Sequence, residues 1–227
     1  TVDGMTFTAG AGDVDYGGRV VVSKGDLKAI ARIRTFPRND KWTWDFEGFS
    51  EMKVPPTWIR VVARMRPVEV DGSVAMRSAP AIDRPSLWIH IGPYKMTGYT
   101  IMADAKLMEV NRRLSRVGIT SQRYNLTLDG NVNRLTIDSW VPHMRLNTSM
   151  KFNVKPGAWY RMKLLVDIQD GVAHVKGKVW ERDSEEPTDW TLVAKDPNPN
   201  YEGSPGLYLY STSESFFDNI QVIPQQP

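Results

Sequence analysis

Apolar and polar residues alternate with a period of two along most of the chain. In the segment LWIHI, leucine and isoleucine alternate with Trp88 and His90, which is the pattern of a strand with one face in a core. The segment 99–106 (YTIMADAK) alternates in the same way. Further segments of this kind follow at short intervals, at 122–128, 133–140, 159–168, 172–180, 190–194, 206–210 and 216–223.

The connections between these segments favour antiparallel pairing. Asp129-Gly130 and Asp170-Gly171 are dipeptides that form tight hairpin turns between neighbouring strands. Only 105–117 places apolar residues near helical spacing, and a long loop with one turn of helix fits that segment equally well. Many short strands separated by Gly and Pro turns therefore predict an all-β, two-sheet antiparallel jelly-roll sandwich, with the alternating apolar residues buried between the sheets.

The N-terminal part of the chain reads differently. The segments TFTAG, GGRVVVSKGD and LKAIARIRTFP give two or three short strands that end before the polar run RNDKW. In wording they resemble the last strands of a bacterial immunoglobulin-like repeat. We expect a partial immunoglobulin-like β segment over 1–37, a boundary near Arg38, and a jelly-roll domain over 38–227. The first strands either lean on the following sandwich or remain from a truncated domain.

Composition narrows the class of protein. The 227 residues are 41% hydrophobic and 24% charged, which is typical of a globular protein and excludes a disordered or collagen-like chain. The absence of cysteine excludes disulfides, thiolate metal sites and cysteine nucleophiles. The net charge of +3 is spread along the chain and does not indicate a nucleic-acid surface. No apolar run is long enough for a membrane span, and the start lacks the features of a signal peptide, as in an excised piece of a protein.

A longer stretch carries a resemblance to a known family. It begins at Trp44 and includes WDFEGFSEMKVPPTWIRV, LWIHIGPYKMTGYTIMADAK, YNLTLDGNVNRLTIDSW, WYRMKLLVDIQDGVAHVKGKVWERDSEEPTDWTL, EGSPGLYLY and FFDNIQVIP. In order and spacing these motifs resemble the C-terminal concanavalin A-like (laminin-G-like) jelly-roll domain of bacterial exported proteins that carry PQQ-type β-propeller repeats. The resemblance covers the chain from Trp44 to Pro224.

The resemblance implies a setting but no established reaction. It implies a β-propeller and an immunoglobulin-like segment upstream in the intact protein, and an extracytoplasmic bacterial location, which is periplasmic, outer-surface or secreted. No PQQ is expected on this chain, because the cofactor-type repeats lie outside it. The wider fold group includes lectins, carbohydrate-binding modules and glycan-cleaving enzymes, so the fold alone does not select a function.

A first set of candidate residues is acidic. Glu181, Asp183 and Glu186 match the E-x-D-x-x-E spelling of retaining β-glucanases of this fold. Those enzymes need apolar, core-facing residues between the carboxylates, whereas here the intervening residues are polar and Pro187 follows at once. Because proline ends strand pairing, we interpret the segment as a charged turn.

A second candidate set joins the two ends of the jelly roll. Asp45 and Glu47 near its start, and Asp218 and Asn219 near its end, carry the oxygen donors that Ca²⁺ prefers. In jelly-roll modules the first and last strands commonly run side by side, so a structural calcium ion would fix both ends. The alternative is that the carboxylates cap turns or pair with Arg60 or Lys53, while Phe46, Phe217 and Ile220 supply core.

A third candidate set is a sugar-binding face. Sugars stack on aromatic rings and bond to planar polar side chains. If the leucines and isoleucines of 122–128 and 133–140 point inward, the polar residues of both strands share the opposite face. Trp88 and His90 then form a further row on that face. The predicted ligand-binding residues are Trp88, His90, Arg123, Asn125, Asp138, Trp140, His143 and Arg145. Tyr94 and Tyr124 are further candidate platforms. The alternative is a solvated, positively charged sheet face.

These observations support a non-catalytic module that binds glycan or packs against neighbouring domains of a cell-surface protein. One alternative is a glycan hydrolase or lyase on the same face, with Asp138 or His143 as acid/base. Another is a purely structural or assembly domain. The three histidines lack the spacing of a zinc site. The expected partner of the module is a polysaccharide or cell-surface glycan, with no nucleic acid and no membrane span.

Overall fold

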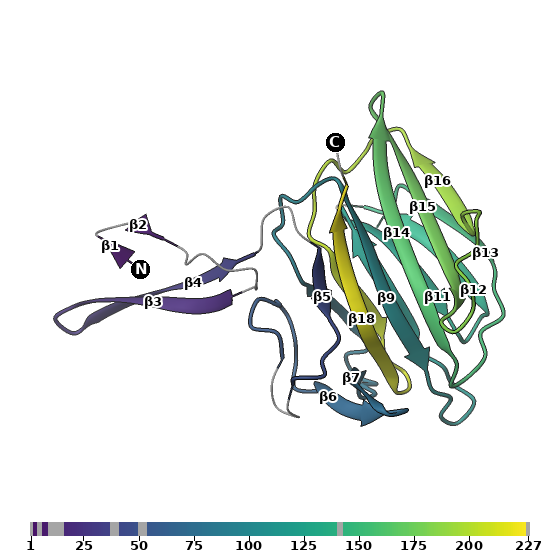
Figure 1. Cartoon of the computed structure of the whole chain (residues 1–227), viewed down its shortest axis with the longest axis horizontal. Helices are drawn as coiled ribbons and strands as arrows, with labels where there is room; N and C mark the ends of the chain where they lie inside the picture. The colour runs from purple at the N-terminus through teal and green to yellow at the C-terminus, as the bar shows by residue number, and fades with distance from the viewer. Residues whose placement is uncertain are drawn as a thin grey trace.

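The computed structural model describes residues 2–3, 6–8, 16–36, 41–49, 54–139 and 143–225. Within them the chain forms strands, turns and loops, and no helix (Figure 1). Two antiparallel sheets pack on each other, which confirms the predicted two-sheet sandwich. The helical alternative for 105–117 is wrong: the strand Tyr99–Leu107 covers its start and a turn follows. No helix of the described part is long and apolar enough to cross a membrane.

One sheet has six strands in the described part of the chain. Its order is β13-β12-β11-β10-β17-β8. The bounds are β8 Ser86–His90, β10 Arg116–Ser121, β11 Tyr124–Asp129, β12 Arg134–Ser139, β13 Asn147–Lys151 and β17 Gly206–Tyr210. The connection 130–133 joins β11 and β12 as a hairpin, as the sequence predicts, but it is longer than a tight turn because Asp129 pairs with Arg134.

The second sheet has eight strands among the described residues. Its order is β16-β15-β14-β9-β18-β7-β6, and β5 also pairs with β18. The bounds are β5 Trp42–Trp44, β6 Met65–Val70, β7 Ser73–Ser78, β9 Tyr99–Leu107, β14 Trp159–Gln169, β15 Val172–Glu181, β16 Leu192–Asp196 and β18 Ser215–Pro224. The pairing of β5 with β18 brings the two ends of the jelly roll together, with Trp44 opposite Ile220.

The core lies between the two sheets and follows the period-two pattern. In the six-stranded sheet the inward residues are fully buried, among them Ile119, Leu126, Leu135 and Ile137. Removing such side chains from water is the main stabilising contribution, at about 25 cal/mol per Å² of apolar surface. Because one parity of each strand fills the core, the other parity of the same strands forms the outer face.

The N-terminal strands extend away from the sandwich. The strands β1 (Val2–Asp3) and β2 (Thr6–Phe7) form one pair, and β3 (Tyr16–Lys24) and β4 (Leu27–Thr35) form a hairpin that projects to the left in Figure 1. The base of this hairpin contacts the jelly roll, because Phe36 stacks on Trp42 with ring centroids 5.0 Å apart. The expected boundary near Arg38 lies outside the described residues.

Candidate functional site

The outer face of the six-stranded sheet carries residues aligned in rows by the strand register. One row contains His90, Gly206, Thr120, Asn125, Asp138 and Asn147. The next row contains Trp88, Tyr208, Gly118, Thr127, Thr136 and Ser149. The third contains Ser86, Tyr210, Arg116, Asp129, Arg134 and Lys151. Aromatic residues therefore lie toward β8, and polar residues lie toward β13.

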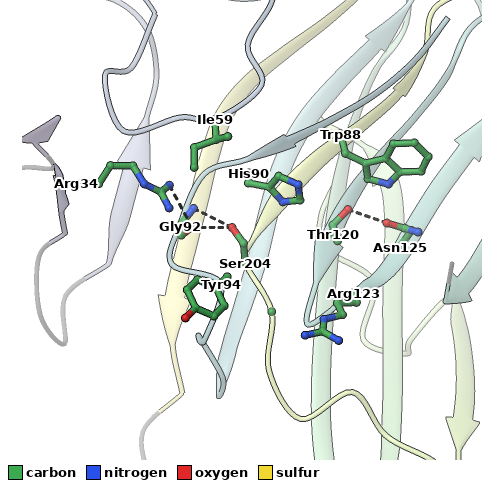
Figure 2. Close-up of a pocket in the computed structure, with 11 residues that line it drawn as sticks. Arg34, Ile59, Trp88, His90, Gly92, Tyr94, Thr120, Arg123, Asn125 and Ser204 are labelled. Carbon is green, nitrogen blue, oxygen red and sulfur yellow. Dashed lines mark hydrogen bonds between the residues drawn. The ribbon is translucent and has the colours of Figure 1, made fainter. Parts of the chain in front are cut away.

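Three pockets adjoin one another along this face. The first, of about 390 Å³, is shown in Figure 2 and is lined by Arg34, Ile59, Trp88, His90, Gly92, Tyr94, Thr120, Arg123, Asn125, Gly203 and Ser204. The second, of about 410 Å³, shares Trp88 with the first. The third, of about 160 Å³, shares Arg116 and Asp129 with the second. At about 4.8 Å between strands, the row of pockets extends over roughly 20 Å.

An aromatic pair separates the first two pockets. The rings of Trp88 and Tyr208 have centroids 4.8 Å apart and are tilted by 51°. The guanidinium of Arg116 lies over the ring of Tyr208, 5.6 Å from its centroid, which is a cation–π arrangement. Burial raises the pKa of Tyr208. The pair thus presents a fixed aromatic surface to the two pockets.

A chain of hydrogen bonds organises the polar part of the face. Thr120 Oγ1 donates to Asn125 Oδ1 at 2.8 Å, and Asn125 Nδ2 donates to Asp138 Oδ1 at 2.7 Å. Arg116 Nη2 donates to Asp138 Oδ2 at 2.9 Å and to Thr127 Oγ1 at 2.7 Å. Asp138 is 2% exposed, so this buried carboxylate is neutralised by Arg116.

The floor of the first pocket is built by close backbone packing. The Gly92 amide donates to Ser204 Oγ at 3.1 Å, and that hydroxyl lies 2.8 Å from the Gly92 carbonyl oxygen. A side chain at Gly203 would meet the backbone of Gln122 at 2.9 Å. At Gly206, between His90 and Thr120 in the row, a side chain would clash with the carbonyl oxygen of Ile89.

The electrostatics of the first pocket are positive. Burial, and then the charges of Arg60 and Arg34, lower the pKa of His90 below its usual range. Burial and the neighbouring Arg32 likewise lower the pKa of Arg34. Of the described residues that line the pocket, none is acidic.

The structure brings together four of the eight residues that the sequence predicts for ligand binding. Trp88, His90, Arg123 and Asn125 line the first pocket, and Asp138 lines the third. Their role in binding stays a prediction. Trp140 lies outside the described residues.

The other two predicted ligand residues lie elsewhere. His143 is exposed and is not among the described residues that line the three pockets. Arg145 Nη2 donates to Asp196 Oδ2 and to the carbonyl of Asn198, both at 3.0 Å, and to Asn200 Oδ1 at 3.1 Å. Its guanidinium is therefore engaged by a neighbouring loop.

The prediction that Tyr124 serves as a platform is wrong. This residue shares the parity of Leu126 and Leu128, and it is fully buried on the core side. Its hydroxyl donates to Asp196 Oδ2 at 2.8 Å, and burial raises its pKa to about 12.

Several residues of the face escape sequence reasoning. Arg34 comes from the N-terminal hairpin, and Ser204 comes from the loop before β17. Tyr208 and Arg116 belong to the strands between β8 and β11. The alternation in GLYLY is a usable signal for Tyr208. It places Tyr208 on the outer face of the strand and the buried Leu207 and Leu209 on the core face.

The E-x-D-x-x-E segment lies on the other sheet, at the end of β15. Glu181 pairs with Lys155, and Glu186 pairs with Lys163 at 2.9 Å and with Lys178 at 3.0 Å. The side chain of Asp183 is 90% exposed. The segment is a charged turn, as the intervening polar residues indicate.

The residues expected to bind calcium meet only in part. The Ser73 hydroxyl contacts Glu47 Oε1 at 2.6 Å and Asp218 Oδ2 at 3.3 Å. Asn219 Nδ2 donates to Asp104 Oδ2 at 2.9 Å. Asp45 instead accepts the backbone N–H of Glu47 at 3.3 Å. Donor groups thus occupy the oxygens that a cation would need.

This cluster does not fit a cation site. No group of three or more His, Asp or Glu in the described ranges could hold a metal ion. Burial and the charges of Asp104 and Glu47 raise the pKa of Asp218 to about 6, against hydrogen bonds from the Asn219 backbone and Ser73. Hydrogen-bond donors from Ser73 and Asn219 already engage the carboxylates of Glu47, Asp218 and Asp104, so we derive no role for calcium.

Comparison with known proteins identifies the fold. No model of a protein family matches the chain, and no curated protein matches it. The chain is similar to the exoplasmic/lumenal domain of VIP36 in its Ca²⁺/Man2-bound form, with a TM-score of 0.50 and 10% identity over 84% of this chain and 89% of that one. It is also similar to a structure from work on endo-acting O-glycanases that prominent members of the human gut microbiota express to initiate mucin breakdown. There the TM-score is 0.53 and the identity is 10%, over 82% of this chain and 99% of that one.

At this identity the similarities show the fold alone. The chain is a concanavalin A-like two-sheet sandwich. The fold alone does not select a function, so the residues of the site have to indicate one.

Proposed function

We propose that this chain is a glycan-binding module whose ligand lies along the outer face of the six-stranded sheet. The observation that carries the proposal is the row of adjoining pockets with Trp88 shared between the first two. A sugar ring stacks on an aromatic face through its C–H groups, and polar side chains at the edge set its orientation. Here Thr120 and Asn125 lie beside Trp88 in the first pocket (Figure 2).

The length of the row favours an oligosaccharide over a single sugar. Pockets that extend over roughly 20 Å along the sheet can hold several linked sugar units. The buried network of Asp138, Asn125 and Arg116 keeps its own geometry without a ligand. Such a face changes little on binding, which limits the loss of conformational entropy.

The carboxylates of the face favour binding over glycan cleavage. Asp129 and Asp138 both line the third pocket. Asp138 is 2% exposed and already accepts hydrogen bonds from Arg116 and Asn125, so it lacks the accessible carboxyl group that a glycosidase acid/base needs.

The wider setting belongs to the same proposal. The family resemblance supports a bacterial, extracytoplasmic protein in which this module follows a β-propeller and an immunoglobulin-like segment. Detection of the intact protein in a periplasmic, surface or medium fraction, against a cytoplasmic marker, tests this location.

Calorimetric titration of the chain with oligosaccharides of plant, algal and bacterial polysaccharides tests the function. Replacement of Trp88 by Ala is expected to weaken binding at least about tenfold, as for aromatic residues at the centre of an interface. Trp190→Ala is the matched control, because this tryptophan lies beside Lys178 on the other sheet. Equal losses in both variants, or no binding by any glycan, would overturn the proposal, and product release abolished by Asp138→Asn would show an enzyme instead.

A further inference from the structure

The first pocket contains two arginines that no carboxylate of the described residues balances. Arg34 and Arg123 line it beside His90, and none of the described lining residues is acidic. The ion pairs of the described ranges include neither arginine. By contrast, Arg116 and Arg145 at the same sheet each pair with an aspartate.

Arg34 is held in place by the protein. Its Nη1 donates to the carbonyl oxygens of Thr57 at 3.0 Å and Gly92 at 3.4 Å, as the dashed line in Figure 2 indicates at Gly92. A guanidinium has five N–H donors, so the contacts through one nitrogen leave its other edge available. The neutral carbonyls orient the group but do not neutralise it.

Arg123 reaches the same pocket from the opposite side in Figure 2. It follows Gln122 in the two-residue turn between β10 and β11, and both residues have positive φ, 47° and 68°. Gly203 packs against this turn, so the turn is supported from behind. The Arg123 side chain is exposed.

The aromatic side chains complete a site for an anionic sugar. Figure 2 shows Tyr94 and His90 between the two arginines, and Trp88 farther along the pocket. Tyr94 is 66% exposed, so its ring is accessible for stacking. Both arginines line the same pocket, so an anion bound there is attracted by both positive charges. The planar donor fork of arginine matches carboxylate and sulfate oxygens.

On the basis of the glycan-binding function proposed above, we propose that the first pocket binds an acidic sugar unit. Its carboxylate or sulfate group lies between Arg34 and Arg123, and its ring stacks on Trp88 or Tyr94. The N-terminal hairpin is then part of the binding site, because β4 supplies Arg34. Neutral units of the same chain occupy the second and third pockets.

The test is calorimetric titration of the whole chain with oligosaccharides of matched length: neutral mannan and glucan fragments, carboxylated oligogalacturonate and alginate fragments, and sulfated carrageenan fragments. One acidic class is expected to bind at least about tenfold more tightly than the neutral class, since a hydrogen bond to a charged group is stronger than one between neutral groups. Whether carboxylated or sulfated fragments bind more tightly identifies the anion.

Variants localise the effect. Arg34→Gln and Arg123→Gln should each weaken binding of the acidic fragment about tenfold and leave any neutral fragment unaffected. Lys195→Gln is the control, since it removes the same charge from an exposed position on β16. Arg123→Gln keeps the experiment decisive if Arg34→Gln disturbs the hairpin, which a thermal melt reports.

Three results would overturn the inference. Neutral fragments that bind as tightly as acidic ones would refute the acidic ligand while the glycan-binding function stands. An equal loss in Lys195→Gln would show diffuse charge attraction instead of a site. Failure of every fragment to bind refutes both this inference and the proposed function.

Discussion

The outer faces of the two sheets use charge in opposite ways. On the eight-stranded sheet, Arg161 pairs with the buried Asp104 at 2.6 Å, and Lys163 and Lys178 share Glu186. On the six-stranded sheet, the pocket beside β8 keeps Arg34 and Arg123 without a carboxylate among the described residues. At Arg161, Lys163 and Lys178 the first face is electrostatically closed, which means that each of these charges has a carboxylate partner, whereas this end of the second face is open.

This difference separates structural charge from charge available to a ligand. A buried ion pair whose two partners neutralise each other keeps its strands in register, but it has no unpaired charge left for a ligand. An unpaired guanidinium adds little to folding and is available for binding. Candidate residues are therefore better ranked by whether their partners are already present than by residue type alone.

Breaking a closed pair should have the largest effect. Replacement of Arg161 by Met leaves the Asp104 carboxylate buried, with Asn219 as its one remaining side-chain donor among the described residues. Loss of one partner from a buried pair costs about 3–5 kcal/mol, and we expect about 3 kcal/mol by urea unfolding at pH 7. A loss below 1 kcal/mol would show that the face is not electrostatically closed.

The second prediction concerns Asp218, next to the same closed face. Its folded-state pKa of about 6 exceeds its ordinary value of 3.8. Its protonation therefore stabilises the fold fully below about pH 4, and this contribution is lost as the pH rises through 6. Asp218→Asn removes the buried charge. The free energy of unfolding of the variant, relative to that of the native chain, should therefore be about 1–2 kcal/mol higher at pH 7.5 than at pH 4.5.

Urea unfolding of both chains at the two pH values measures this difference. The comparison of variant and native chain cancels the other titrating groups, such as Asp71 and Glu186, whose pKa values are lowered. A difference that does not change with pH would show that Asp218 is charged in the fold. Added Ca²⁺ should leave both chains unchanged, because a bound ion would stabilise by mass action.

The sequence predicts the sandwich and half of the site because period two is a local signal. Leu126 and Ile137 point inward, so Asn125 and Asp138 necessarily share the outer face. The pairing of these two residues follows from the hairpin at Asp129-Gly130. Trp88 and His90 follow from the same alternation in β8.

The rest depends on contacts between distant segments. The apolar residues of 105–117 mimic helical spacing because Leu107 ends β9 and Val117 belongs to β10, while Val110 is exposed at the turn between them. Arg34 reaches the pocket through the placement of a hairpin whose own sequence contains no sign of it. Neither fact is encoded within a window of ten residues.

The third prediction concerns the pH dependence of ligand binding at the open face. Burial and the charges of Arg60 and Arg34 lower the pKa of His90; Arg123 and Tyr94 are the other titratable groups that line the pocket. A bound anion favours protonated His90, so by reciprocity the affinity for an acidic oligosaccharide should rise a few-fold as the pH falls from 8 to 5. His90→Gln should flatten this dependence, and a neutral oligosaccharide should not show it. An unchanged slope in His90→Gln would assign the dependence to another group.

The smallest expected effect is on the stability of the open face itself. Arg123 has no ion pair within the described part of the chain, so Arg123→Gln should change the free energy of unfolding by less than about 0.5 kcal/mol, as is usual for surface substitutions. Lys155→Met is the matched control, because it removes an exposed cation that does have a partner, Glu181. Urea unfolding of these two variants beside Arg161→Met places all three on one scale. If Arg123→Gln lost as much stability as Arg161→Met, its charge would serve the fold, and the two faces would not differ in the way proposed.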